Sequence, residues 1–298
     1  MKAGSQASLI LDAHNTLGEG VTWCPRSQSL YWTDIHASVL WRYRPSDGST
    51  RRWPMPDRLA SFALCEDDDW LLLGLAGGLA FFHLEHGRLI RITDVEAGLP
   101  TRLNDGACDR QGRFVFGTLH EPVGGEARRA AGAFYRLHAD LTLEQLPLGP
   151  VAISNSIAFS PDGATMYYCD SFARTVHRCS YGDSVAEPHV HIDLTQQRGE
   201  PDGSAVDSEG GLWNAEWGAG RVVRYDRHGK QDLVIEVPAS QPTRVAFGGE
   251  RLNTLYITSA RDGLSAETLA NEPHAGGLFA IEVPFTGIPE PRFAGRPM

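Results

Sequence analysis

The chain has 298 residues, with 27 Lys and Arg against 37 Asp and Glu, which gives a net charge of −10. This acidic balance argues against nucleic acid as a partner. No stretch approaches the roughly 18 apolar residues of a membrane-spanning helix, so no membrane partner is expected either.

Two features of the sequence predict a cytoplasmic location. Residues 1–8 lack the hydrophobic core of a signal peptide, so secretion is not expected. The five cysteines form no paired-spacing motif, and their odd number argues against a disulfide framework. A reducing compartment is therefore the simpler expectation.

Along the chain a similar unit recurs, with a short apolar strand, a turn rich in Asp and Gly, and a second strand ending in aromatic residues. The units open near residues 19, 61, 104, 155, 202 and 243. A unit of this kind repeating every roughly 40 to 50 residues is typical of a β-propeller. Third strands are expected at 39–43, 133–137, 176–178 and 222–225.

Six units account for the length, and the sequence therefore predicts an all-β, six-bladed β-propeller forming a single domain over residues 1–298. Closure of the ring requires a strand from one end to complete a blade begun at the other. We expect residues 8–12 to form the outer strand of the last blade, beside 277–281, which leaves no exposed sheet edge between the termini. Segments 120–131 and 261–276 are expected to be loops on one face, where specificity loops usually lie.

Four polar residues occupy one position of the repeat: Glu19, Asn104, Asn155 and Asp202. If the repeats surround an axis, these two carboxylates and two amides converge on it. An all-oxygen cluster of this kind suits a hard divalent cation. The sequence therefore predicts a central metal site on the propeller axis.

By its motifs and their order, nearly the whole chain resembles the gluconolactonase, luciferin-regenerating enzyme and senescence-marker-protein family of six-bladed propellers. The motifs that carry this resemblance lie at 17–20, 31–35, 102–106, 154–155 with 160–162, 201–203 and 258–263. At one point the sequence departs from the family, because Ser156 stands where members commonly have Gly. A different local backbone is expected there.

The resemblance implies an enzyme, a metal-dependent lactonase that hydrolyses a sugar lactone to the aldonic acid. It also implies that Glu19, Asn155 and Asp202 bind the metal, and that Arg102 and Asn104 face the substrate above it. Members often carry a substrate-contacting Glu beyond the Asn-Asp-Gly motif. Glu121, one residue short of that register, is the candidate here.

The expected chemistry agrees with these residue types. Lactone hydrolysis passes through a tetrahedral oxyanion, which a divalent cation can stabilise. Asp202 is the best candidate for the catalytic base, since a carboxylate beside a metal can take a proton from the attacking water. Oxygen ligands admit calcium, magnesium, manganese, zinc or ferrous iron, so the identity of the metal stays open.

Several alternatives remain at this point. The chain could be a non-catalytic propeller that binds a metal or a partner, or a hydrolase of other esters or of phosphotriesters. The segments Asn104-Asp105-Gly106 and Asp202-Gly203 could be structural turns. Arg102 could pair with an acidic neighbour, and Asp105 could orient Arg102 or serve the turn. We expect a small sugar lactone as the only partner, and a monomer or weak homodimer.

Overall fold

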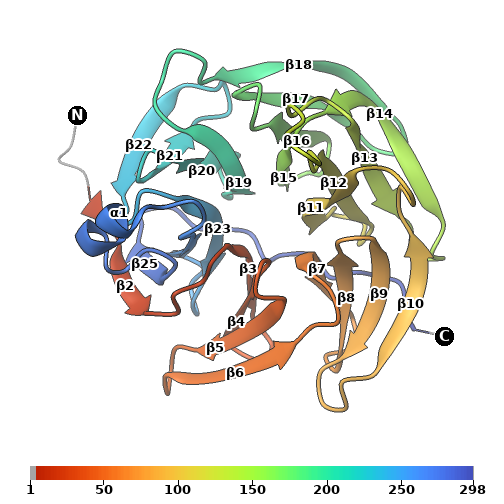
Figure 1. Ribbon diagram of the computed structural model, residues 1–298, viewed down its shortest axis with the longest axis horizontal. Coiled ribbons are helices and arrows are strands. Elements are labelled where there is room, and N and C mark those ends of the chain that lie inside the picture. The colour runs from red at the N-terminus through yellow and green to blue at the C-terminus, as the bar shows by residue number, and fades with distance from the viewer. Residues whose placement is uncertain (1–4, 298) are drawn as a thin grey trace.

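Six β-sheets surround a central axis in the computed structural model, which describes residues 5–297 (Figure 1). Each sheet is one blade. Apart from the two strands nearest the N-terminus, which are added at the outer edges of the last two blades, the strands run from the axis outward in chain order and pair antiparallel. The all-β, six-bladed propeller expected from the sequence is therefore confirmed. No helix within residues 5–297 is long and apolar enough to cross a membrane.

The first three blades use consecutive strands of the chain. They are blade 1, with β3 (Gly18–Cys24), β4 (Ser29–Asp34), β5 (Val39–Arg44) and β6 (Ser49–Pro54); blade 2, with β7 (Leu59–Leu64), β8 (Trp70–Leu75), β9 (Gly78–His83) and β10 (Leu89–Asp94); and blade 3, with β11 (Thr101–Cys108), β12 (Phe114–His120), β13 (Gly132–Leu137) and β14 (Leu143–Val151).

The last three blades include the strands nearest the N-terminus. They are blade 4, with β15 (Ser154–Phe159), β16 (Thr165–Asp170), β17 (Thr175–Tyr181) and β18 (Val185–Asp193); blade 5, with β19 (Glu200–Val206), β20 (Leu212–Trp217), β21 (Arg221–Tyr225), β22 (Gln231–Glu236) and β1 (Ser5–Gln6); and blade 6, with β23 (Pro242–Gly248), β24 (Thr254–Ser259), β25 (Leu278–Glu282) and β2 (Ser8–Leu11).

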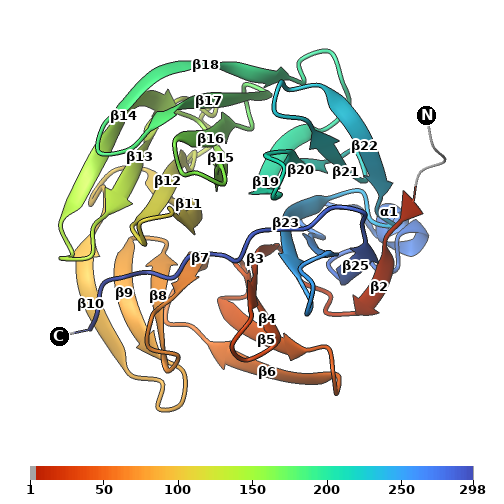
Figure 2. The same ribbon diagram turned by 180° about the vertical axis from the view of Figure 1, so that it is seen from behind.

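The ring closes as the sequence predicts. Strand β2 pairs antiparallel with β25, with Leu9 opposite Phe279, so the N-terminal segment completes the last blade. Strand β1 adds a short parallel edge to blade 5, beside β22, which was not expected. The C-terminal segment then crosses the face of the ring that Figure 2 shows and reaches blade 2. There Phe293 is fully buried and forms a bridge to Cys65.

The hydrophobic core lies between neighbouring blades. Trp23 of blade 1 stacks on Tyr256 of blade 6 with ring centroids 5.8 Å apart, and Trp213 of blade 5 meets Phe247 of blade 6 edge to face at 5.5 Å. Aromatic pairs in these arrangements add to the stabilisation that comes from burying their area. Trp23 and Trp213 therefore pack neighbouring blades together. All five cysteines are buried and free, which agrees with the prediction of no disulfide framework.

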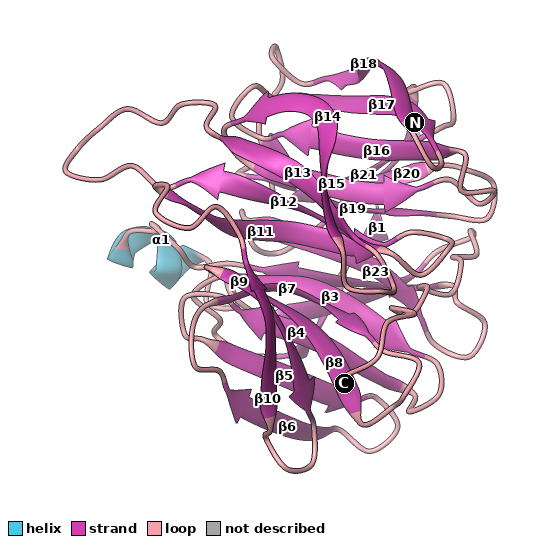
Figure 3. Ribbon diagram, turned by 90° about the vertical axis from the view of Figure 1, so that its right-hand side faces the viewer, coloured by secondary structure: helices cyan, strands magenta, loops and turns pink. Residues whose placement is uncertain are grey.

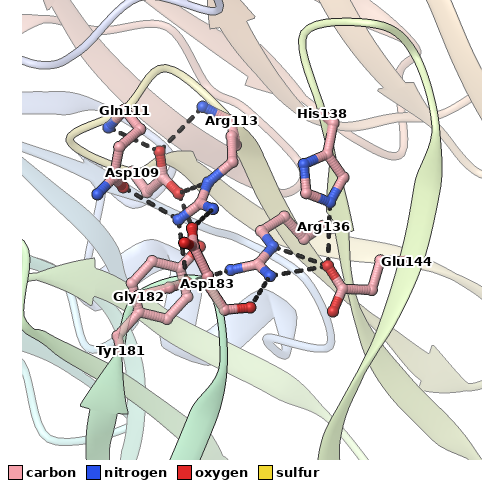
Figure 4. Close-up of polar contacts among 9 residues, drawn as sticks. All are labelled: Asp109, Gln111, Arg113, Arg136, His138, Glu144, Tyr181, Gly182 and Asp183. Atoms are coloured by element: carbon pink, nitrogen blue, oxygen red, sulfur yellow. Dashed lines mark hydrogen bonds and ion pairs between the residues drawn. The ribbon is translucent and has the colours of Figure 1, made fainter.

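A buried carboxylate, Asp109, stabilises the turn between β11 and β12 of blade 3. Asp109 is fully buried and accepts hydrogen bonds from the backbone of Gln111 and Arg113, from Arg113 Nε at 2.5 Å and from Tyr181 OH at 2.7 Å. Figure 4 shows this group beside Arg136, whose guanidinium reaches Glu144 and the carbonyl of Gly182. Because Tyr181 belongs to blade 4, these contacts tie two blades together.

Two segments expected as loops lie on one face of the ring. Residues 121–131 connect β12 and β13 without a regular element, and they project from the same face as helix α1 (Ala266–Asn271) (Figure 3). The helix corrects the expectation of an irregular loop at 261–276. Its six residues are too few to show helical periodicity in the sequence, and it begins at Ser265, whose hydroxyl accepts from Thr268 N.

Candidate functional site

A β-bulge interrupts the inner strand of every blade near the axis. The register shifts fall within 19–22, 59–61, 103–106, 155–158, 201–204 and 242–245. Because a bulge bends the strand and re-aims its side chains, it turns residues at these positions toward the axis. The polar position recognised in the sequence coincides with these bulges.

The six predicted site residues line one pocket of about 470 Å³ at the axial mouth: Glu19, Arg102, Asn104, Glu121, Asn155 and Asp202. We refer to this space as the axial pocket. Arg128 from loop 121–131 and Asp262 from the segment before α1 also line it, so it opens on the face that carries both loops (Figure 3). Residues far apart in the sequence are thus brought together.

Glu19 and Asp202 form the acidic floor of the axial pocket. Burial raises the pKa of the Glu19 carboxyl, and the nearby charge of Asp105 raises it further. Burial also raises the pKa of Asp202 well above its usual range, with Glu19 as the next contributor. Two buried carboxylates this close together disfavour each other's charged form. A bound cation would relieve this repulsion.

The two amides are held in one orientation by hydrogen bonds. Asn104 Nδ2 donates to Asn155 Oδ1 at 3.0 Å and to the carbonyl of Ser154 at 2.8 Å. Asn155 Nδ2 donates to Ser171 Oγ at 2.9 Å. The oxygen of Asn155 therefore faces Asn104 and retains a lone pair for a further partner.

Ser156, which follows Asn155, has a φ of +59°, in the left-handed region that glycine favours. Gly20, which follows Glu19, has a φ of +67°. The different backbone expected from a serine at this position is therefore not observed, since Ser156 adopts the conformation of a glycine. Its hydroxyl donates to the carbonyl of Asp202, a contact that no glycine can make.

Arg102 is buried at the wall of the axial pocket and contacts the amide pair. Its Nη1 donates to Asn104 Oδ1 at 3.0 Å and to the carbonyl of Leu103 at 2.8 Å, and its Nε lies 3.3 Å from Glu121 Oε1. Burial lowers the pKa of Arg102 to about 10. Arg102 therefore pairs with an acidic neighbour, Glu121, as one alternative held, and it also lines the axial pocket.

Glu121 lines the axial pocket but is already paired. Arg58 donates to both of its oxygens, at 2.6 and 2.8 Å, and these hydrogen bonds are the main cause of its lowered pKa. A two-pronged Arg–carboxylate contact fixes the position of both groups. Arg58 lies just before β7, outside every motif, and its role was not predicted from the sequence.

Asp105 pairs with Arg244 of blade 6 and does not orient Arg102. Its Oδ1 accepts from Arg244 Nη1 and from the backbone of Gly106, and its Oδ2 accepts from the backbone of Ile157 at 2.9 Å. Asp105 also supports its own bulge through Gly106. Arg244 was missed because nothing in the sequence marks a partner 139 residues away. Arg244 also lowers the pKa of Glu19, but this effect is smaller than the increases that burial and Asp105 cause.

The donor set of the floor fits a divalent cation. Asp202 Oδ1 is buried and has no hydrogen-bond partner, although a buried polar atom without a partner costs free energy. Two carboxylates and one amide supply only oxygen ligands, as hard cations prefer. Within residues 5–297, no group of three or more His, Cys, Asp and Glu side chains is placed to bind a metal, so a cation here would need the Asn155 amide.

The remaining wall of the axial pocket combines an aromatic ring with charged groups. Trp217 lines it, and so does Glu200, its partner across β19 and β20. Arg128 completes this wall, and its Nη1 donates to the carbonyl of His120 at 2.5 Å. The predicted face loop pointed to Arg128, whereas no sequence signal marked Glu200.

Comparisons with known proteins show which family the chain resembles over most of its length. Residues 17–261 match the family described as the SMP-30/Gluconolactonase/LRE-like region. The chain is 54% identical to L-arabinolactonase of Azospirillum brasilense, with 98% of this chain and 97% of the relative covered. It is 39% identical to 6-deoxy-6-sulfogluconolactonase of Pseudomonas putida, with 94% and 96% covered. The crystal structure of regucalcin from Agrobacterium tumefaciens, named a calcium-binding protein, has a TM-score of 0.91 at 30% identity, with 98% and 99% covered.

Proposed function

Because the chain belongs to the SMP-30/gluconolactonase/LRE-like family, as its sequence predicted, we propose that it is a metal-dependent lactonase that converts a sugar lactone to the aldonic acid. The observation that carries this proposal is the meeting of Glu19, Asn155, Asp202 and Arg102 in one pocket. The 54% identity to L-arabinolactonase makes L-arabinolactone the first substrate to test.

Glu19, Asn155 and Asp202 would hold the metal through their side-chain oxygens. A divalent cation bound there supplies a Lewis acid that polarises the lactone carbonyl and stabilises the charge that develops on its oxygen. Calcium is the first candidate, because the oxygen donors suit it and a similar structure is named calcium-binding. Magnesium, manganese, zinc and ferrous iron are the other candidates.

Asp202 would act as the general base. With one carboxylate oxygen bound to the cation, its other oxygen would accept a proton from the water that attacks the lactone carbonyl. The ring C–O bond then breaks, and the proton is returned to the oxygen that leaves. Arg102 and Asn104 would bind the lactone from the adjacent wall, where Arg102 donates to an oxygen of the substrate.

The wall formed by Trp217, Glu200 and Arg128 would recognise the sugar hydroxyls. Glu200 can accept hydrogen bonds from hydroxyls, Arg128 can donate to them, and Trp217 offers an apolar surface for the carbon face of the ring. A pocket of about 470 Å³ falls within the ordinary range for small-molecule sites.

A screen of sugar lactones with a pH indicator tests the proposed activity. We expect hydrolysis of L-arabinolactone well above its spontaneous rate, with six-carbon lactones measured in parallel. If no sugar lactone is hydrolysed in the presence of any of the five metals, the protein is a binding propeller and not a lactonase. Hydrolysis of only a simple ester or a phosphotriester would assign a different substrate class.

Replacement of Arg102 by alanine should separate substrate binding from metal binding. We expect kcat/KM for the lactone to fall by about 10- to 100-fold, because a hydrogen bond to a charged group contributes about 1.5 to 3 kcal/mol. Metal content should stay unchanged, since Asn104 keeps its bonds to Ser154 and Asn155. Lactone kinetics and metal analysis of the same preparation measure both.

The matched control for this variant is Arg110→Ala. Arg110 lies on the same blade but away from the axial pocket, and it donates to the carbonyls of Ser160 and Phe159. Its replacement should leave both readouts at the parental level. A loss of metal from Arg102→Ala in parallel with the loss of rate would place Arg102 among the groups that hold the metal.

A further inference from the structure

Two serines of blade 4 contact consecutive carbonyls of blade 5, next to the Asp202 side chain. Ser171 Oγ donates to the carbonyl of Pro201 at 2.7 Å, and Ser156 Oγ donates to the carbonyl of Asp202 at 2.6 Å. Both serines are buried. These contacts cross from one blade to the next at the level of the axial pocket.

Each serine hydroxyl also accepts a hydrogen bond from an asparagine. Asn155 Nδ2 donates to Ser171 Oγ at 2.9 Å, and Asn214 Nδ2 donates to Ser156 Oγ at 2.9 Å. Since a hydroxyl has only one proton to donate, an incoming amide bond leaves that proton for the carbonyl. Both serines are thereby fixed as donors to blade 5.

The bulge in β19 explains why the carbonyl of Asp202 needs side-chain donors. The register of β19 and β20 shifts between Pro201 and Ser204, which places Asp202 and Gly203 outside the regular pairing. A buried carbonyl without a partner is costly, and Ser156 supplies a donor to the carbonyl of Asp202. Asn214 Nδ2 reinforces this arrangement by donating to the carbonyl of Asp202 at 2.9 Å.

Through these bonds, two of the three proposed metal ligands are linked by short paths. Ser156 follows Asn155 in the chain and holds the backbone of Asp202, and Ser171 joins the Asn155 amide to the residue before Asp202. Both paths run through buried atoms and few rotatable bonds. The hydrogen bonds from the two serines of blade 4 to blade 5 therefore restrain the separation of Asn155 and Asp202.

We propose that Ser156 and Ser171 are positioning residues that fix the separation of Asn155 and Asp202, so that metal affinity depends on their hydroxyls. This inference rests on the proposed metal site of the lactonase. Similar hydroxyl bridges join other blades, such as Thr33 Oγ1 to the carbonyl of Leu59 at 2.8 Å. Thr243 Oγ1 likewise donates to the carbonyl of Gly18, the residue before Glu19. What distinguishes the serine pair is that one of its two bridges ends at the backbone of a proposed ligand itself, Asp202.

Calorimetric titration of metal-free protein with calcium ions tests the proposal, and is repeated with manganese and zinc ions. Ser156→Gly and Ser171→Ala should each bind the ion about 10- to 100-fold more weakly, as is typical when a group that orients a ligand is lost. Glycine suits the left-handed backbone of Ser156, so Ser156→Gly removes the hydroxyl while easing the conformation. Its unfolding midpoint without metal should stay near that of the parent.

The matched control is Ser259→Ala. Ser259 is buried and donates to the carbonyl of Gly277 at 2.9 Å, within blade 6 and outside the axial pocket. The Ser259→Ala variant should bind the ion with the affinity of the parent. Parental affinity in both Ser156→Gly and Ser171→Ala, or an equal loss in Ser259→Ala, would overturn the positioning role and leave the proposed function intact. A parent chain that binds none of the ions would instead reject the metal site itself, and the inference with it.

Discussion

Asp202→Asn is expected to lower the rate of lactone hydrolysis by about 10²- to 10⁴-fold, the usual effect of removing a positioned general base. Asparagine keeps an oxygen that can bind a cation, but it does not take up a proton near neutral pH. The loss should therefore appear in kcat and should persist at saturating metal. Initial rates, corrected for spontaneous hydrolysis and measured against metal concentration, give both quantities.

Glu19→Gln is the matched comparison, because it makes the same carboxylate-to-amide change on the other acidic ligand. It reduces the charge of the ligand set and should act through metal affinity, so excess metal should restore much of its activity. If saturating metal also restores Asp202→Asn to near the parental rate, Asp202 is a ligand only. The proton acceptor would then be another group of the axial pocket.

Asp109→Ala is expected to lower the free energy of unfolding by about 3 to 5 kcal/mol, the range seen when one partner of a buried ion pair is removed. The fully buried carboxylate accepts from Arg113 and from Tyr181 of the next blade (Figure 4). Its loss leaves the Arg113 guanidinium without its closest carboxylate and the Tyr181 hydroxyl without its acceptor. Denaturant unfolding of parent and variant measures the difference.

Asp162→Ala is the control for this stability effect. Asp162 occupies the corresponding turn of blade 4 but is exposed, and it accepts only from Ser160 Oγ and the backbone of Ala164. Its replacement should cost about 1 kcal/mol, the contribution of an ordinary hydrogen bond. Equal costs for the two variants would show that the contacts between blades 3 and 4 around Asp109 add nothing to stability.

The period of the chain was sufficient to predict the blades. Each inner strand is short, apolar and followed by a turn, so the six units were visible without any knowledge of their neighbours. Ring closure by residues 8–12 beside 277–281 was predicted from the need to cover the last sheet edge, and the structure confirms it with strands at 8–11 and 278–282. The polar position of the repeat also predicted which side chains would meet, since equivalent positions in a ring lie at the axis.

Contacts between blades could not be predicted in the same way. Arg244 pairs with Asp105, and Arg58 pairs with Glu121, yet the partners are 139 and 63 residues apart and share no motif. Such pairs depend on side-chain directions near each bulge, which the repeat does not encode. The short parallel strand β1 and the six-residue helix α1 were also missed, because each has too few residues to show a period.

The most direct test of the account is to titrate metal-free protein with calcium while following L-arabinolactone hydrolysis and bound metal in the same samples. We predict no hydrolysis above the spontaneous rate without metal, and activity that rises in proportion to occupancy up to one ion per chain. Glu19→Gln should require more metal to reach the same occupancy. Full activity in metal-free protein, or activity that does not follow occupancy, would contradict the account.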